Sequence, residues 1–218
     1  MRPISIAIDG PAGAGKSSVT KALAKSLGYV LLDTGAMYRS ITLYSLQNNG
    51  EIAENQLSNI DFEIRHDNGE YRYFLNSQNV TDEIRSERVT LKVSEISALS
   101  HVRNFAVKLQ RKLAEEAVSN GNGVILEGRD IGTTVLPAAD LKIYLTASVI
   151  ERARRRALEN GTTPESQIPL IESRDYADEN REFSPLRQAV DAVVIDSSDL
   201  SFEQVLERLL TLVSEKIA

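Results

Sequence analysis

Residues 4–17 read ISIAIDGPAGAGKS, and this stretch decides the fold. Its first five residues are mostly apolar and form a run of the length of one buried strand. Residues 10–17 fit the pattern G-x-x-x-x-G-K-[ST], whose glycines allow amide N–H groups to converge on phosphate oxygens. Apolar residues four apart predict a helix from about Lys16 to Leu27, and its positive dipole end would face the same phosphate. The stretch therefore predicts a strand, a phosphate-binding loop and a helix.

The loop predicts a site for a nucleoside triphosphate. The residues expected to hold it are Gly10, Pro11, Ala12, Gly13, Ala14, Gly15, Lys16, Ser17 and Ser18. We expect the Lys16 ammonium to reach the β- and γ-phosphates and the Ser17 hydroxyl to bind Mg²⁺. Asp33 is the candidate for orienting a water on the metal, and Glu127 is the alternative, although either acid could instead serve as a helix cap or a strand end. The expected co-substrate is ATP with Mg²⁺.

Composition narrows the class of protein. The chain has 218 residues, enough for one α/β domain with a small insert, and a net charge of −6 from 25 basic and 31 acidic residues. It has no cysteine, which excludes disulfides and thiolate chemistry, and its two histidines lack the spacing of metal ligands. An acidic chain is a poor partner for nucleic acid, and no apolar run reaches the length of a membrane span. We expect a cytoplasmic protein that binds neither nucleic acid nor a membrane.

The rest of the chain alternates between strand and helix patterns. Strand-like runs occupy residues 29–33, 123–127, 140–148 and 192–198. A helix is expected over 34–50 with Thr34 as its N-cap, helical spacing over 89–118 breaks near 99–103, and Ser201 with Gln204 forms a capping box for a closing helix. This alternation predicts a mostly parallel sheet with helices on both faces.

One segment breaks the alternation. Residues 60–85 have alternating apolar positions on either side of residues 66–69, which read His-Asp-Asn-Gly, a hairpin-type turn signal. We expect a small antiparallel insert over about 60–90, within a region that spans 34–92. An ordinary hairpin without a function is the alternative.

A phosphate-binding loop alone leaves three functions open. A GTP-hydrolysing switch needs a guanine-reading N-K-x-D motif, which the sequence lacks. A motor ATPase usually has a strand that ends in Asp-Glu, whereas residues 124–127 end in the single acid Glu127. A kinase for a small acceptor remains, and phosphoryl transfer then requires positive charge on both sides of the moving group.

Arginines could supply the positive charge on the acceptor side of the transferred phosphoryl group. They occur at separate places along the chain, at Arg39, Arg103, Arg129, Arg152, Arg155, Arg156, Arg174 and Arg181. Arg39 and Arg129 follow strand ends, at the edge where open α/β sheets bind ligands. Forked guanidinium groups hold phosphate oxygens at two points, so this pattern favours a kinase.

Three of these arginines lie on one face of a predicted helix. Arg152, Arg155 and Arg156 are three and four residues apart. They could form a salt-bridged face with Glu151 and Glu159, or a lid that closes on ATP. Because like charges on one face repel, the spacing favours the lid, over residues 150–183.

Several blocks together resemble one family. They are GPAGAGKSS (10–18), LDTGAMYR (32–39), NVTDEIRS (79–86), EGRDIGTTVLP (127–137), RARRR (152–156), RDYADENREFSPL (174–186) and DAVVIDSS (191–198). In this order and spacing they closely resemble the bacterial cytidylate kinases, nucleoside monophosphate kinases with a P-loop. The resemblance implies a single P-loop kinase domain over 1–218, in which the insert is an acceptor-nucleotide subdomain and the arginine-rich segment is a lid.

The resemblance also implies roles for individual residues. Arg39 would hold the CMP phosphate beside Thr34 and Tyr38, and Ser94, Arg103 and Asp130 would read the cytosine edge. Arg129 would contact the acceptor phosphate, Arg174 and Asp178 the ribose, and Arg181 the phosphates. The catalytic set is Lys16, Arg129, Arg152, Arg155, Arg156 and Arg181. A carboxylate such as that of Asp130 suits the exocyclic amino donor of cytosine.

The expected reaction is ATP-dependent, Mg²⁺-assisted phosphorylation of CMP or dCMP by a monomer. The rival activities are a kinase for UMP or AMP, a non-catalytic nucleotide sensor that presents its insert to a protein partner, and a nucleic-acid kinase, which the net charge disfavours. The preference between CMP and dCMP stays open.

Overall fold

The computed structural model describes residues 3–67 and 70–218, in two compact units. The first unit comprises Met1–Leu32 and Arg111–Ala218, and the second comprises Asp33–Gln110. Each unit has its own sheet, one with five strands and one with three. In the described part of the chain, no helix combines the length and the apolar composition that a membrane crossing requires.

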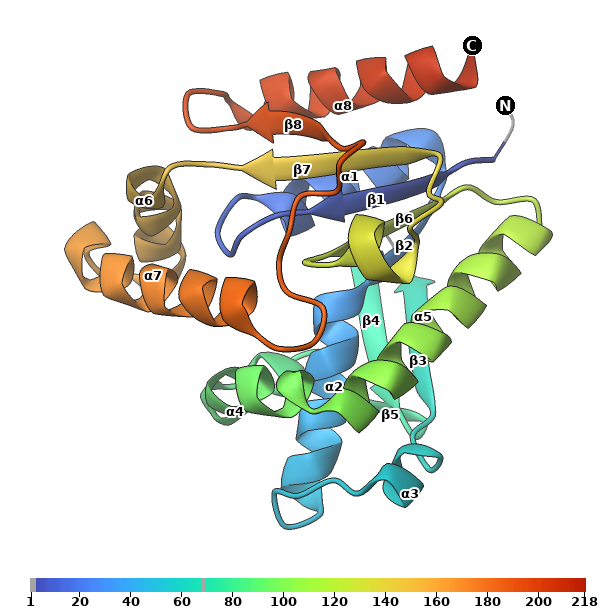
Figure 1. Cartoon of the computed structure of the whole chain (residues 1–218), viewed down its shortest axis with the longest axis vertical. Coiled ribbons are helices and arrows are strands. Elements are labelled where there is room, and N and C mark those ends of the chain that lie inside the picture. Colours follow the sequence, from blue (N-terminus) through green and yellow to red (C-terminus); the bar gives the residue numbers. More distant parts are fainter. Residues whose placement is uncertain (1–2, 68–69) are drawn as a thin grey trace. The chain divides into compact units, whose positions relative to one another are not determined.

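The sheet of the first unit is built around its first strand (Figure 1). The strand order is β2-β6-β1-β7-β8, and β1 pairs in parallel with both β6 and β7, while β7 pairs in parallel with β8. The bounds are β1 Ser5–Asp9, β2 Val30–Asp33, β6 Val124–Gly128, β7 Leu141–Thr146 and β8 Val193–Asp196. The predicted parallel sheet is confirmed.

Burial explains why β1 occupies the centre. Ile6 and Ile8 are fully buried, as are Ile125 and Leu126 on the neighbouring β6. A strand with a neighbour on each side and helices over the sheet is enclosed everywhere, and its sequence reads as a nearly continuous apolar run. Because β1, β6, β7 and β8 run parallel, their carboxyl ends lie along one edge of the sheet.

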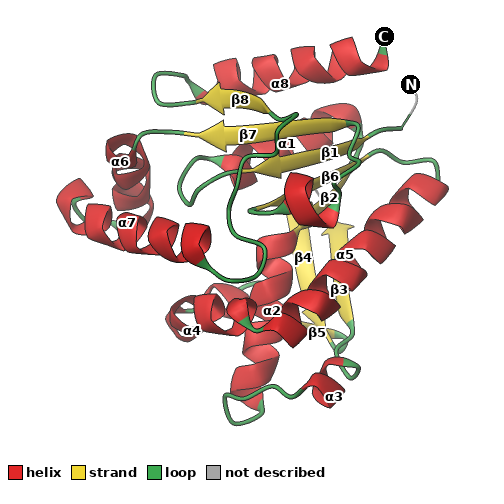
Figure 2. Cartoon of the chain, viewed as in Figure 1, coloured by secondary structure: helices red, strands yellow, loops and turns green. Residues whose placement is uncertain are grey.

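The helices of the first unit follow the predicted pattern (Figure 2). Their bounds are α1 Lys16–Leu27, α6 Val149–Asn160, α7 Pro164–Asn180 and α8 Phe202–Ile217, with a short π-helical turn, η2, at Ile131–Val135. Helix α1 packs on β1 and β6 and against α8, and α6 packs against α7. Gly28, with φ of 67°, ends α1, and the predicted capping box of Ser201 and Gln204 begins α8.

The second unit contains the antiparallel insert. Its elements are α2 Thr34–Gln47, α3 Glu54–Leu57, β3 Phe62–Asp67, β4 Glu70–Leu75, β5 Gln78–Asn79, the turn η1 Glu83–Arg85, α4 Glu87–Ala98 and the first half of α5 Ser100–Ser119. Strands β3, β4 and β5 pair as an antiparallel sheet, which confirms the hairpin, although residues 68 and 69 of its turn lie outside the described residues.

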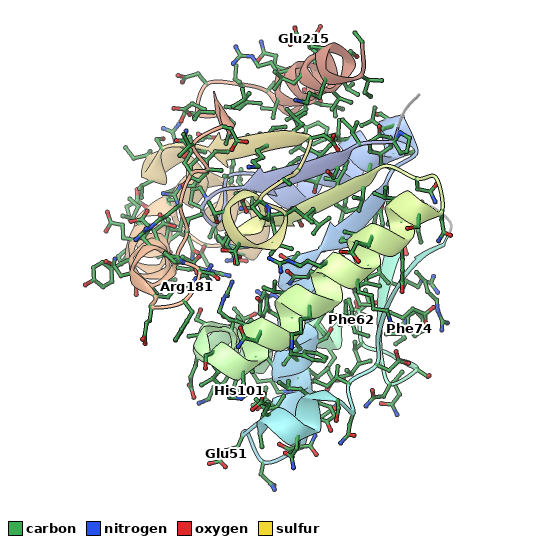
Figure 3. All side chains as sticks on the ribbon, turned by 45° about the vertical axis from the view of Figure 1, so that its right-hand side comes forward. Glu51, Phe62, Phe74, His101, Arg181 and Glu215 are labelled. Atoms are coloured by element: carbon green, nitrogen blue, oxygen red, sulfur yellow. The ribbon has the colours of Figure 1, made fainter. Side chains whose placement is uncertain are left out.

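Alternation along the insert separates its two faces. Phe62 and Tyr73 are buried, with ring centroids 6.4 Å apart. Phe74, which Figure 3 labels together with Phe62, points to the other face, where the Arg65 guanidinium lies 3.9 Å from its ring centroid. One face of the hairpin therefore supplies the core of the second unit, and the other face is charged.

The predicted N-cap of α2 is wrong by one residue. Asp33 is the cap, because its Oδ1 accepts a hydrogen bond from the Ala36 N–H at 2.9 Å, and Thr34 is the first helical residue. A carboxylate satisfies a free amide and also interacts favourably with the positive end of the helix dipole. The helix ends at Gln47 with Asn48 as its C-cap, within the expected range of 34–50, and the break between α4 and α5 falls at Leu99 as predicted.

Gly10 is the tightest position of the loop, and its replacement tests the fold. Its φ is 148°, and a Cβ there would lie 1.9 Å from the Leu145 carbonyl oxygen of β7. We predict that Gly10→Ala lowers the free energy of unfolding by about 3 kcal/mol or more, because β7 cannot move away without breaking the sheet. Urea unfolding followed by circular dichroism measures this.

Gly161 provides the matched control. Its φ is 63°, but no other atom lies within 4 Å of its would-be Cβ. Gly161→Ala should cost only about 1 kcal/mol, the strain of the left-handed backbone alone. Equal losses in the two variants would contradict the steric account of Gly10.

Candidate active site

The phosphate loop joins β1 to α1 in the first unit. Gly13 and Gly15 have φ of 77° and 88°, in the left-handed region that the glycine pattern predicted. Gly15 is also the N-cap of α1, and as a glycine it offers no side chain to the amides of the first turn. Those amides and the helix dipole therefore face the loop, which is the arrangement of an anion site.

Lys16 is folded into the loop. Its Nζ donates to the carbonyl oxygens of Gly10 at 2.7 Å and Pro11 at 2.8 Å. Burial, and then the charge of Arg129, hold the pKa of Lys16 well below its ordinary value, while the carboxylates of Glu127 and Asp9 oppose that shift. A desolvated ammonium of this kind gains strongly from a nearby phosphate charge.

Two oxygen groups beside the loop suit Mg²⁺. The Ser17 side chain is exposed in the first turn of α1, and Glu127 is the last residue but one of β6, the neighbour of β1. The Thr20 hydroxyl lies 3.2 Å from Glu127 Oε2 and 2.9 Å from the Lys16 carbonyl oxygen, so Glu127 lies beside the first turn of α1. Mg²⁺ keeps several waters and needs few protein ligands, so this pair fits the metal. No group of three or more His, Cys, Asp or Glu side chains poised for a metal occurs among the described residues.

Asp33, the other sequence candidate, has both carboxylate oxygens engaged within the second unit. Oδ1 caps α2 through the Ala36 N–H, and Oδ2 accepts from the Tyr73 hydroxyl at 3.0 Å. Both oxygens of Asp33 thus have partners within the second unit, and its role beside the metal stays a prediction.

Asp9 is a site residue that the sequence reading missed. It ends β1 directly before the loop, and its two oxygens accept the backbone N–H groups of Ile131 at 2.8 Å and Gly132 at 2.7 Å. Burial raises the pKa of Asp9 to about 6, against the effect of these hydrogen bonds, and the charge of Asp130 adds to the rise. Asp9 therefore fastens the start of the phosphate loop to the turn that follows Arg129 and Asp130.

A charge cluster on the same unit gathers four predicted residues. Arg129 Nε donates to Asp178 Oδ2 at 2.9 Å. The Arg181 guanidinium, labelled in Figure 3, lies 3.8 Å from Asp178 Oδ1 and 3.7 Å from Asp130 Oδ1. Burial acts to raise the pKa of Asp178, but Arg129, Arg174 and Arg181 together hold it below its ordinary value. The cluster therefore brings the predicted acceptor-phosphate, base and ribose residues of this unit together.

Two arginines of α6 donate hydrogen bonds to backbone carbonyls of the phosphate loop. Arg152 is buried, and its guanidinium donates to the carbonyls of Ala147 at 3.0 Å and Ala12 at 3.1 Å. Arg155 donates to the Ala14 carbonyl at 3.3 Å and to the Ser197 carbonyl at 2.7 Å. Both side chains stabilise the loop from within the protein.

The repulsion argument for a lid is therefore wrong. Arg155 pairs with Glu151 at 3.1 Å, and Arg156 pairs with Glu159 at 3.0 Å, so the salt-bridged alternative is present on α6. The sequence left both arrangements open and repulsion favoured the lid, but acids three and four residues away compensate the positive charge.

The second unit carries the other predicted acceptor residues. Arg39 donates to the Ile84 carbonyl at 3.1 Å and to the Thr90 hydroxyl at 2.9 Å. The Arg103 guanidinium lies 5.3 Å from the ring centroid of Tyr38. Thr34 is buried at the start of α2 and Ser94 is exposed on α4. The unit thus brings Tyr38 and Arg103 together and anchors Arg39 on η1 and α4.

The comparison with known families decides the relationship. The sequence model described as Cytidylate kinase matches residues 6–215. The chain belongs to the cytidylate kinase family. A cytidylate kinase of Caldicellulosiruptor bescii is 46% identical over 222 residues, which cover 97% of this chain and 96% of that protein. One of Leuconostoc mesenteroides is 44% identical over 228 residues, covering all of both chains.

Solved structures support the fold. A Thermus thermophilus protein aligns over all of both chains with a TM-score of 0.54 at 20% identity. A sugar kinase from Janibacter aligns over 97% of this chain and 95% of its own, with a TM-score of 0.52 at 13% identity. At these identities the similarity shows a shared fold alone.

The raised pKa of Asp9 gives a pH-dependent prediction. Folded Asp9 binds its proton up to about pH 6, whereas in the unfolded chain it releases the proton near pH 4, so its stabilising contribution is complete below about pH 4 and is lost as the pH rises through 6. Relative to Asp9→Asn, which cannot titrate, the wild type should lose about 1.4 kcal/mol of unfolding free energy between pH 5 and pH 8.

Urea unfolding of both proteins at several pH values measures this difference. Groups that titrate in both proteins cancel in the comparison, and the lost acceptor oxygen contributes a constant offset. A difference that does not change with pH would show that Asp9 is ionised in the folded protein at all these pH values.

Proposed function

We propose that this protein transfers the γ-phosphoryl group of ATP to CMP or dCMP and releases ADP with CDP or dCDP. The observation that carries the proposal is the arrangement at the carboxyl ends of the neighbouring strands β1 and β6. The phosphate loop follows Asp9 on β1, and Arg129 follows Gly128 on β6, with Asp9 and Gly128 at the same level of the register. One sheet edge thus presents a donor-phosphate loop beside a cluster of arginines. The relatives named cytidylate kinase supply the acceptor.

The residues of the first unit account for the donor half of the reaction. Loop amides and the α1 dipole bind the phosphates, and the Lys16 ammonium exchanges its bonds with the Gly10 and Pro11 carbonyls for bonds with phosphate oxygens. Ser17 and Glu127 would hold Mg²⁺, which neutralises phosphate charge when bound. No covalent intermediate is needed, because alignment and positive charge lower the barrier of phosphoryl transfer.

Arginines stabilise the transferred group from the acceptor side. Arg129 and Arg181 are held by carboxylates in a largely buried cluster, with side chains 19% and 12% exposed. Positive groups fixed before the reaction cost no reorganisation as charge develops. Arg152, Arg155 and Arg156 remain proposed catalytic residues of a lid over residues 150–183 that closes over ATP, and closure would keep water from the phosphate.

The acceptor base is proposed to be read by Asp130. Its carboxylate accepts from the exocyclic amino group of cytosine, with Ser94 and Arg103 donating to the ring acceptors. Uracil presents a carbonyl in place of the amino group, which would face the carboxylate unfavourably. Thr34, Tyr38 and Arg39 would bind the acceptor phosphate, and Arg174 and Asp178 the ribose. We further propose that the protein is a cytoplasmic monomer with one kinase domain over 1–218, whose region 34–92, with the insert at about 60–90, binds the acceptor.

An acceptor panel tests the activity. ADP release is measured with Mg²⁺ and ATP in the presence of CMP, dCMP, UMP, AMP or GMP, and without an acceptor. We predict strong turnover with CMP and dCMP and rates near the blank with the others. ADP release at the same rate without an acceptor would favour an ATPase, and no turnover at all would favour a nucleotide sensor.

Two substitutions separate the donor and acceptor halves. Lys16→Ala should lower kcat at least about 100-fold, because a positive group beside the moving phosphate is lost, whereas Lys25→Ala on the exposed end of α1 should change little. Asp130→Ala should lower kcat/KM for CMP about 100-fold and leave the KM for ATP within about twofold. Equal effects of Asp130→Ala on both substrates would contradict its role in base recognition.

A further inference from the structure

The buried Arg152 contacts the phosphate loop at Ala12 and Gly13. Its guanidinium donates to the Ala12 carbonyl at 3.1 Å, and the adjacent Gly13 packs so closely that a Cβ there would lie 3.2 Å from Arg152 Cβ. The Ala12–Gly13 segment is therefore held by one side chain of α6. Any residue that controls the position of Arg152 also controls this segment.

Asp175 of α7 is that residue. Its Oδ2 lies 2.7 Å from the same guanidinium nitrogen of Arg152, and the two side chains are only 15% and 5% exposed. Removal of one member of a buried pair leaves the other charge uncompensated, so the partner moves or takes in water. The ion pair thus links α7 to the phosphate loop through a single intermediate side chain.

The same turn of α7 faces the acceptor side. Asp178, three residues after Asp175, accepts from Arg129 at 2.9 Å and lies beside Arg181. Residues three apart lie on one face of a helix, so neighbouring positions of α7 contact Arg152, which holds the donor loop, and the arginine cluster. The contact between Asp175 and Arg152 is not predicted by the local sequence.

We propose that Asp175 is a positioning residue: through Arg152 it fixes the Ala12–Gly13 segment of the donor loop. The kinetic part of this inference rests on the proposed function. The structural part, that Asp175 restrains the loop, does not depend on the reaction.

The variant Asp175→Asn tests the inference, with Glu172→Gln as its matched control. Glu172 is exposed on the same helix, so the control removes the same charge without touching Arg152. Asp175→Asn should raise the KM for ATP about fivefold to tenfold and lower kcat, while the KM for CMP changes less than about twofold. Asp175→Glu keeps the charge but displaces it by one methylene group, and it should recover part of the loss.

Hydrogen exchange of the free protein provides a measurement independent of activity. The amides of residues 12–16 should exchange at least about tenfold faster in Asp175→Asn than in Glu172→Gln, while those of β1 and β6 do not change. When Arg152 is already replaced by Met, adding Asp175→Asn should have no further effect on the loop, because the intermediate side chain is gone.

The outcomes distinguish the two claims. If the wild type fails to phosphorylate CMP, the proposed function is wrong, and the exchange data still test the restraint. If the wild type is active but Asp175→Asn matches Glu172→Gln in exchange and in both KM values, the inference is overturned. Equal increases in the two KM values, or faster exchange throughout the unit, would indicate a general structural role and would also overturn it.

Discussion

The first unit depends on largely buried carboxylates that hold cations around the phosphate loop. Asp178 holds Arg129, Asp175 holds Arg152, and the charges of Asp9 and Glu127 act on Lys16. Without these acids, several buried positive groups at one sheet edge would repel one another. The acids allow a cationic site to exist before any phosphate binds, and phosphate oxygens can then compete for the same donors.

The parallel sheet gives that interaction its geometry. Because β1 lies between β6 and β7, the loop after β1 is flanked by Arg129 on one side and by the Leu145 carbonyl on the other. Gly10 is required by the close approach of β7, and Asp9 ties β1 to the turn beyond Asp130 through two amides. The loop is consequently held by the neighbouring strands on both sides. Arg152 and Arg155 of α6 hold it further by donating hydrogen bonds to its carbonyls.

Local patterns predicted the elements better than the contacts between them. Interactions between residues close in sequence determine the bounds of α1, the capping box of Ser201 and Gln204, and the hairpin of the insert. The N-cap of α2 was misplaced because Asp33 and Thr34 are adjacent and both are good caps, and only the bond to Ala36 separates them. The family blocks identified Arg129, Asp130, Asp178 and Arg181, and the structure shows them as one cluster in the first unit.

Two functional side chains could not be found in the same way. Asp9 meets Ile131 across 122 residues of chain, and Asp175 meets Arg152 from a different helix, so neither pairing leaves a mark in local spacing. The only available signal was chemical, an acid at the end of a buried strand or beside buried arginines. For α6, repulsion between the arginines was given more weight than salt bridges to Glu151 and Glu159, and the structure contains those salt bridges.

The central claim is that the site passes a phosphoryl group between two nucleotides and does not release it to water. The most direct test follows the γ-phosphorus of ATP, by incubating the protein with Mg²⁺, CMP and ATP that carries a radioactive γ-phosphate, and separating the products by chromatography. The account predicts that nearly all of the released label appears in CDP. Label that appears mainly as inorganic phosphate while CMP is present would contradict it.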